Sequence, residues 1–149
     1  MTHMKKNILV VDDSALMRRV MCDIINSDSK FQATDYCRDG LEAYEKLKHT
    51  SYDGVVLDVN MPRMDGLQLL EKLQKEGIRA NVVMVSTLTD SREADVTILA
   101  MERGAIDFVA KPTNIIEAKG EAFKRQLLGV LNAVLATQKA AESVRPAVK

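Results

Sequence analysis

The chain has 149 residues, the size of one ordinary domain with room for a proper core. Hydrophobic residues make up 46% of it and charged residues 28%, as in a soluble globular protein, and its 21 basic residues match its 21 acidic residues. This balance favours neither nucleic acid nor an anionic membrane as a partner, and no apolar run approaches the about 20 residues that span a bilayer. No apolar segment of signal-peptide length lies near the start, and the two cysteines are isolated, so we expect a cytoplasmic protein.

Short apolar runs predict five strands. The runs at residues 8–11, 55–57 and 82–85 are continuous, which is typical of strands buried inside a parallel sheet. Residues 106–110 predict the last strand, and residues 33–37 give the weakest of the five signals.

Apolar residues recur at helical spacing between and after these runs, which predicts five helices. The apolar faces are marked by Met17, Val20, Met21, Ile24 and Ile25, by Leu41, Tyr44 and Leu47, by Leu67, Leu70 and Leu73, by Val96, Leu99 and Ala100, and by Phe123, Leu127, Leu131 and Val134. Ser14 is suited to cap the first helix, and Gly104 to end the fourth. The pattern dissolves beyond about residue 140, so we expect one domain over residues 1–138 and a tail or linker over 139–149.

Alternating strands and helices predict an α/β fold, with a doubly wound five-stranded parallel sheet covered by helices on both faces. In such sheets the ligand site lies beyond the carboxyl ends of the strands. The polar residues expected there are the candidates for function: Asp12, Asp13, Asp58, Ser86, Thr87 and Lys111.

Three carboxylates, a hydroxyl and a lysine at one edge suggest a particular chemistry. Close carboxylates repel unless a cation neutralises them, and oxygen ligands with room for water suit Mg²⁺. A free carboxylate beside such an ion can attack phosphorus and become an acyl phosphate, while the metal and an ammonium offset the developing charge. A hydroxyl can then bind the new phosphoryl oxygens, which makes a switch.

Each of these residues also has a plainer interpretation. Asp12-Asp13-Ser14 could be only a helix cap, and Asp58 could only begin a turn. Ser86 alone is uninformative, and Lys111 could be a solvated surface residue. Their joint occurrence at strand ends favours the functional interpretation.

Four stretches carry a family resemblance: Val10-Val11-Asp12-Asp13-Ser14, Leu57-Asp58-Val59-Asn60-Met61-Pro62-Arg63-Met64-Asp65-Gly66, Val85-Ser86, and Lys111-Pro112. Over roughly residues 6–138 the chain resembles the bacterial response-regulator receiver family, with its flavodoxin-like fold of five strand-helix units. The resemblance implies that Asp58 accepts a phosphoryl group from a histidine kinase. It also implies that Mg²⁺ is held by Asp12, Asp13, Asp58 and the backbone carbonyl of Asn60.

The same resemblance implies further roles. Lys111 would contact the phosphoryl group, and its bond to Pro112 would be cis. Ser86, in preference to Thr87, would be the switch hydroxyl. Phe108 would be the aromatic of the last strand that changes rotamer, without the hydroxyl of the Tyr that many receivers have there.

A narrower resemblance concerns the output. The stretches Asp13-Ser14-Ala15-Leu16-Met17-Arg18, Met84-Val85-Ser86-Thr87-Leu88-Thr89 and Gly104-Ala105-Ile106-Asp107-Phe108-Val109-Ala110-Lys111-Pro112 are similar to the receiver half of chemotaxis protein-glutamate methylesterases. That resemblance implies a methylesterase catalytic domain in cis as a partner. The chain departs from the family in having no Gly-x-Ser-x-Gly elbow, and its only histidines are His3 and His49, so we expect no hydrolase site here and a truncated protein.

Three alternatives stay open at this point. The chain could be a stand-alone receiver, or the receiver of a transcription regulator whose output domain is missing. It could also be a phosphatase-like hydrolase that uses the same acidic pocket on external substrates, since both classes use aspartyl-phosphate chemistry.

Overall fold

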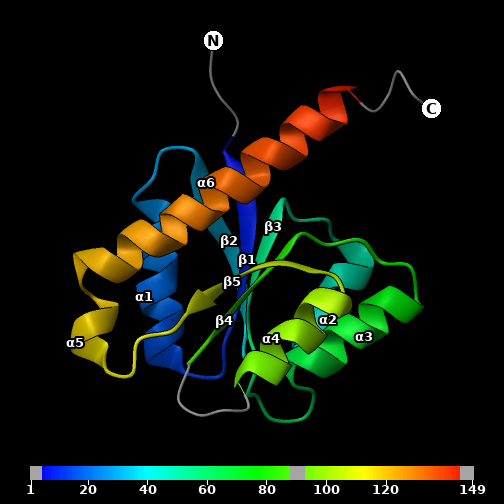
Figure 1. Cartoon of the computed structure of the whole chain (residues 1–149), viewed down its shortest axis with the longest axis horizontal. Coiled ribbons are helices and arrows are strands. Elements are labelled where there is room, and N and C mark those ends of the chain that lie inside the picture. The colour runs from blue at the N-terminus through cyan, green and yellow to red at the C-terminus, as the bar shows by residue number, and fades with distance from the viewer. Residues whose placement is uncertain (1–4, 88–92, 145–149) are drawn as a thin grey trace.

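A central sheet of five parallel strands organises the molecule (Figure 1). The computed structural model describes residues 5–87 and 93–144. The strands are β1 Lys6–Val11, β2 Phe31–Cys37, β3 Gly54–Asp58, β4 Val82–Ser86 and β5 Ala105–Ala110. They lie in the order β2-β1-β3-β4-β5, so the chain winds outward from β1 in both directions. The prediction of a doubly wound five-stranded parallel sheet is confirmed.

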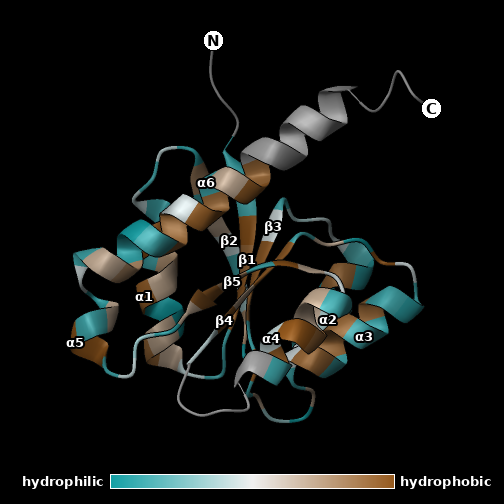
Figure 2. Ribbon diagram, viewed as in Figure 1, coloured by the Kyte–Doolittle hydropathy of each residue, from teal (hydrophilic) through white to brown (hydrophobic). Residues whose placement is uncertain are grey.

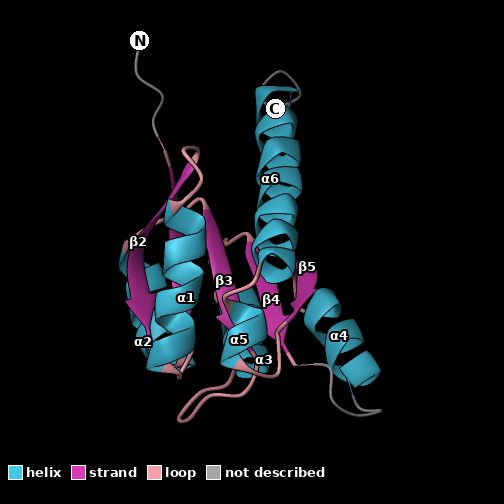
Figure 3. Ribbon diagram, turned by 90° about the vertical axis from the view of Figure 1, so that its left-hand side faces the viewer, coloured by secondary structure: helices cyan, strands magenta, loops and turns pink. Residues whose placement is uncertain are grey.

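Helices cover both faces of this sheet (Figure 3). Helices α1, α5 and α6 pack on one face, and α2, α3 and α4 pack on the other. Their bounds are α1 Ala15–Asn26, α2 Gly40–His49, α3 Gly66–Lys75, α4 Glu93–Glu102, α5 Ile115–Ala118 and α6 Glu121–Val144.

The inner strands supply the centre of the core, and Figure 2 shows their hydrophobic colouring between the helical layers. Alternate residues of β1 face opposite layers: Ile8 and Val10 pack with α1, α5 and α6, whereas Leu9 and Val11 pack with α2, α3 and α4. All residues of β3 and β4 are buried, as expected of strands covered on both faces.

Local capping fixes where the helices begin and end. Ser14 Oγ accepts the backbone N–H of Met17 at 3.2 Å, so the predicted cap of α1 is confirmed. Gly104, the second residue after α4, has φ +106°, a conformation that favours glycine, which confirms its predicted role in ending that helix.

The carboxyl-terminal third differs from the sequence prediction in two respects. A one-turn helix, α5, precedes the long last helix, and Asn114 caps it by accepting the Glu117 N–H at 2.8 Å. One turn is too short to display a hydrophobic period, so the pattern could not reveal it. Helix α6 continues past residue 138 to Val144, while the boundary between domain and tail stays a prediction. No helix in the described ranges is long and apolar enough to cross a membrane.

The expectation of a cis Lys111-Pro112 bond is wrong. No peptide bond among the described residues is cis, so this bond is trans. The trans form is the one that an X-Pro bond favours intrinsically, by roughly 0.5–1 kcal/mol. Lys111 still lies at the sheet edge, because its N–H donates to Ser86 O at 2.8 Å. Two predicted segments, Leu88-Thr89 and residues 145–149, lie outside the described residues.

Candidate functional site

The carboxyl ends of four strands bring the predicted polar residues to one edge of the sheet. Asp12 follows β1, Asp58 ends β3, Ser86 ends β4 and Lys111 follows β5. Four polar or charged residues are buried in the part of the chain that the structure describes, and three of them are Asp12, Asp58 and Ser86. Because a buried charge is costly without a partner, this concentration marks the candidate site.

Lys111 is the cation that partners the two buried carboxylates. Its Nζ lies 2.9 Å from Asp12 Oδ2 and 3.1 Å from Asp58 Oδ2, so one ammonium bridges the ends of β1 and β3. Burial would lower the pKa of Lys111, but the charges of Asp58 and Asp12 raise it above its usual value. The lysine is therefore held in its charged form.

Asp58 has the environment of a destabilised anion. It is only 4% exposed, and the backbone N–H of Val59 donates to its Oδ1 at 2.8 Å. Burial, followed by the charge of Asp12, raises the pKa of Asp58 to about 6, although Lys111 acts in the opposite direction. A carboxylate with this little hydration is well placed to react or to bind a metal.

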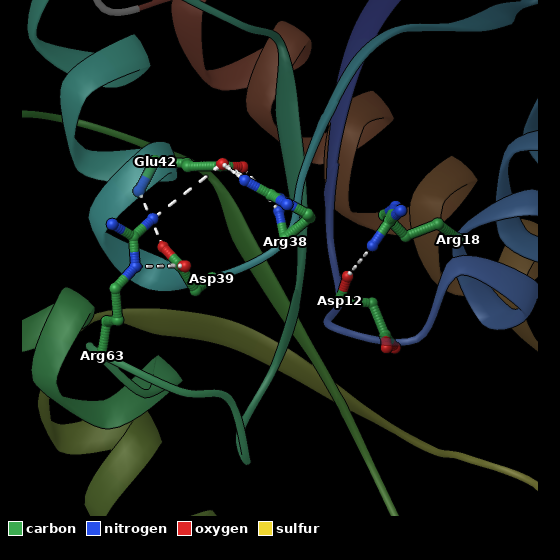
Figure 4. Close-up of polar contacts among 6 residues, drawn as sticks. All are labelled: Asp12, Arg18, Arg38, Asp39, Glu42 and Arg63. Atoms are coloured by element: carbon green, nitrogen blue, oxygen red, sulfur yellow. Dashed lines mark hydrogen bonds and ion pairs between the residues drawn. The ribbon is translucent and has the colours of Figure 1, made fainter.

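Asp12 is held by local hydrogen bonds and leaves one oxygen facing the site. Its Oδ1 accepts the Ser14 N–H at 2.8 Å, and its backbone oxygen accepts a hydrogen bond from Arg18 Nη1 at 2.9 Å (Figure 4). Its buried Oδ2 accepts no well-aligned hydrogen bond and faces the Lys111 ammonium as an ion pair. Asp13, in contrast, is exposed.

The donor set fits a hard divalent cation. Asp12, Asp13 and Asp58 each offer a carboxylate oxygen, and these oxygens lie within 4.8 Å of one another. Three carboxylates with one ammonium leave a net negative charge, which a divalent ion would neutralise. An all-oxygen set with one exposed member also leaves room for water, as Mg²⁺ requires.

The remaining predicted residues lie at or near the carboxyl ends of β3, β4 and β5. Ser86 is buried, Thr87 is half-buried, and Asn60 lies exposed in the segment after β3. Phe108 pairs with Met84 in the β4–β5 register and packs, partly buried, against the core layer of α2, α3 and α4. The structure thus places these four residues near the carboxyl edge, and their roles stay predictions.

Sequence reasoning missed one buried charge and its partner. Asp39, the fourth buried polar residue, is ion-paired with Arg63 at 2.8 Å (Figure 4). The position of Asp39 directly before an apolar helical pattern is an N-cap signal and could have revealed that half of the pair. No sequence signal joins it to Arg63, 24 residues away.

The response regulator receiver domain model matches residues 8–120, which include β2 to β5, most of β1 and the acidic cluster. The chain belongs to this family. Two-component signalling is therefore its context, and its fold is that of a receiver.

Curated relatives narrow the comparison. A protein-glutamate methylesterase/protein-glutamine glutaminase of Pyrococcus horikoshii is 45% identical over 124 residues, which cover 83% of this chain and 33% of that protein. The protein of the same name from Escherichia coli (strain UTI89 / UPEC) is 44% identical over 147 residues, which cover 97% of this chain and 37% of that protein. The chain thus spans about a third of the length of these relatives and is homologous to their receiver part.

Solved structures of receiver domains are also similar to this chain. The response regulator domain of Thermotoga maritima CheB has a TM-score of 0.77 and 34% identity, with 89% of this chain and 98% of that chain covered. A Borrelia burgdorferi CheX-CheY-BeF3-Mg complex has a TM-score of 0.71 and 29% identity, with 87% and 88% covered.

Proposed function

We propose that this chain is the phosphorylatable receiver of a chemotaxis methylesterase, and that Asp58 accepts a phosphoryl group from the phosphohistidine of a histidine kinase in the cytoplasm. The observation that carries the proposal is the buried Asp58 carboxylate, 3.1 Å from the Lys111 ammonium and grouped with Asp12 and Asp13. The identity of 44–45% to methylesterases along the receiver supports the narrower assignment.

The transfer needs an ionised, accessible oxygen on Asp58. That oxygen forms a bond to phosphorus while the P–N bond to the donor histidine breaks, and the released imidazole takes up a proton from water. Lys111 stands where its ammonium can offset charge on the transferred oxygens.

The donor set supports Mg²⁺ as the cofactor. Asp12, Asp13 and Asp58 would hold the ion together with the backbone carbonyl of Asn60. When bound, Mg²⁺ supplies a hard positive charge that offsets the carboxylates and the phosphoryl oxygens. The role of the chain's own residues is to orient these oxygens at the strand ends.

The output surface is expected on α4, β5 and α6. Ser86 would bind a phosphoryl oxygen and pull the segment after β4 towards the phosphoryl group. Phe108 would then turn into the space that this movement opens beside it. Ile98, Met101 and Ile106 are exposed apolar residues on α4 and β5, which suits a surface that contacts a catalytic domain. In the full-length protein, that domain would be the methylesterase.

A phosphorylation assay tests the central claim. Incubation with acetyl phosphate and Mg²⁺ should add one phosphoryl mass to the chain, and Asp58→Asn should abolish the adduct because an amide is not a nucleophile. EDTA should also prevent the reaction. A full adduct on the Asp58→Asn variant would show that another residue is the acceptor.

The alternatives are less well supported. A phosphatase-like hydrolase would turn over a small phosphomonoester in steady state, whereas a receiver should hydrolyse only its own phosphoryl group. A stand-alone receiver or the receiver of a transcription regulator would share the same site, and the high identity to methylesterases argues against both.

A further inference from the structure

A buried carboxylate lies outside the acidic cluster, at the start of α2. Asp39 is 3% exposed and caps α2 by accepting the Glu42 N–H at 3.0 Å. Its other oxygen accepts a hydrogen bond from Arg63 Nε at 2.8 Å (Figure 4). Burial would raise the pKa of Asp39, but Arg63 and the backbone N–H groups hold that pKa below its usual value. Asp39 is therefore a fixed anion whose side-chain partner comes from another loop.

Arg63 reaches this carboxylate from a strained turn. It has φ +65°, the only positive φ of a residue other than glycine in the described ranges. The Met64 N–H donates to Pro62 O at 2.7 Å, which closes a three-residue turn centred on Arg63. A γ-turn with a positive central φ is the rare, strained form, and such strain persists only where the surroundings impose it. The ion pair with Asp39 is one such constraint.

The strained turn belongs to the β3–α3 loop (residues 59–65), which begins directly after Asp58. The backbone of this loop is fastened at two more points: the Gly40 N–H donates to Met64 O at 2.8 Å, and the Gly66 N–H donates to Val59 O at 2.8 Å. A Cβ at Gly40 would fall 2.5 Å from Met64 O, so these two loops touch at a place where only glycine fits. Arg63 thus adds a long-range side-chain constraint, to a residue 24 positions away, to a loop whose first residues border the site.

We propose that Arg63, anchored on Asp39, is a positioning residue that holds the β3–α3 loop in the shape needed for divalent-cation binding at the acidic cluster. This inference rests on the proposed function, because the loop would contribute the Asn60 carbonyl to that cation. Arg63 also lines a groove of about 420 Å³ together with Asp13 and Asp39, so the ion pair and the exposed carboxylate of the cluster face the same space.

Simple electrostatics predicts the opposite change in cation affinity when Arg63 is removed. Arg63 carries a positive charge near a cation site, so removing it should strengthen cation binding if charge alone mattered. Positioning predicts weaker binding, because a relaxed loop must be ordered again when the ion binds. The direction of the change therefore separates the two explanations.

The test measures the Kd for Mg²⁺ by calorimetry on the unphosphorylated chain, and separately the rate of modification by acetyl phosphate as a function of Mg²⁺ concentration. Arg63→Ala and Arg63→Gly should each raise the Kd roughly tenfold, the usual effect of losing a residue that orients metal ligands. The modification rate at saturating Mg²⁺ should return close to that of the parent. Arg63→Lys, which keeps a cation within reach of Asp39, should recover part of the affinity.

Arg38→Ala is the matched control. Arg38 lines the same groove and pairs with Glu42 at 2.9 Å, a carboxylate that Arg63 reaches only at 3.9 Å, so the loss of Arg38 removes the same charge and leaves the Arg63–Asp39 ion pair in place. Its Kd should stay the same or fall. An unchanged or lower Kd in Arg63→Gly would overturn the positioning role, as would an equal rise in Arg38→Ala. A parent chain that neither binds Mg²⁺ nor accepts phosphoryl would instead refute the proposed function.

Arg63 is half-exposed, so its substitution should leave the fold intact, and circular dichroism of each variant checks this. Asp39→Asn provides a second route to the same question. The amide can still cap α2 but no longer attracts Arg63 as an anion, so the Kd for Mg²⁺ should rise again. A folded Asp39→Asn chain with the parent's Kd would count against the proposal.

Discussion

At the scale of single residues, the surroundings of Asp58 disfavour its ionised form. Burial and the charge of Asp12 raise its pKa to about 6 from 3.8, so the folded apo domain prefers the neutral acid. The stability that this preference gives is fully present below pH 4 and is lost as the pH rises towards 6. Above pH 6 the ionised carboxylate destabilises the apo domain, and a bound divalent ion would remove that penalty.

The cost of ionising Asp58 predicts that Asp58→Asn stabilises the apo domain at pH 7. The amide cannot ionise, so the variant avoids a cost on the order of 1–3 kcal/mol, at about 1.4 kcal/mol per pKa unit. Lys111 keeps Asp12 as a partner at 2.9 Å. Urea unfolding in EDTA at pH 7 measures the difference.

The control for this prediction is the same comparison at pH 4, where the folded domain holds Asp58 as the neutral acid and no charge has to be buried. The stability gain of Asp58→Asn should shrink there towards zero. A variant that is less stable than the parent at pH 7 would mean that the Lys111 ion pair outweighs the burial of the charge.

The two charged clusters differ in how far sequence could predict them. Asp12, Asp58 and Lys111 directly follow or end apolar strands, and parallel strands end at one edge, so their meeting follows from the pattern alone. Asp39 and Arg63 meet only because two loops pack side by side, and no periodicity specifies that contact. The prediction of a cis Lys111-Pro112 bond is wrong because it rests on a family pattern, and such a pattern does not fix the isomer in a particular chain.

At the scale of elements, burial decided which parts of the fold could be predicted. Strands β3 and β4 are buried throughout, and their continuous apolar runs predict them directly from the sequence. Strand β2 lies at the sheet edge, and between its two buried end residues exposed positions alternate with half-buried ones, so it lacks a continuous apolar run and its signal is weak. Helix α5 has four residues, fewer than two turns, and left no periodic signal.

The elements β4, α4 and β5 should carry the switch. The Lys111 N–H bonds to Ser86 O, and Phe108 pairs with Met84, so a change at the end of β4 reaches β5 through the sheet. Beryllofluoride, which mimics the phosphoryl group on Asp58, should shift NMR signals of residues 93–110. Ser86→Ala should still accept a phosphoryl group but show smaller shifts, because the hydroxyl that binds the new oxygen is lost.

Thr87→Ala is the paired variant for the switch, since it removes the other hydroxyl at this strand end. It should transmit the change as the parent does. If Thr87→Ala loses the NMR shifts while Ser86→Ala keeps them, Thr87 and not Ser86 supplies the switch hydroxyl. If the parent shows no shifts in α4 and β5, the proposed switch does not operate.

At the scale of the whole molecule, the site and the proposed output surface occupy different sides. The acidic cluster lies at the carboxyl edge of the sheet, whereas α4 and β5 lie at one side of the molecule (Figure 3). These two elements carry the exposed residues Ile98, Met101 and Ile106. Helix α6 runs along the face opposite α4 and ends away from the carboxyl edge of the sheet (Figure 1). A partner could therefore cover α4 and β5 while the kinase reaches Asp58.

This separation predicts that the chain restrains a catalytic domain supplied in trans. The methylesterase domain of a full-length relative, added to this chain, should bind it and lose activity, and beryllofluoride should change that binding. The chain alone should release no methanol from methylated receptor glutamates. A coupling of roughly 1–3 kcal/mol is the usual scale, so restraint should be relieved about 5- to 150-fold.

Charge substitutions on the exposed apolar residues locate the contact. Ile98→Glu should weaken binding at least roughly tenfold, because a buried unpaired carboxylate in an apolar interface costs more than about 1.4 kcal/mol. Ile116→Glu is the matched control, since Ile116 is 81% exposed on α5, in the other helical layer, and its substitution should leave binding unchanged. Titration calorimetry with the catalytic domain measures both. Equal losses in the two variants would indicate non-specific hydrophobic association, and a loss only in Ile116→Glu would move the output surface to the α1 and α5 side.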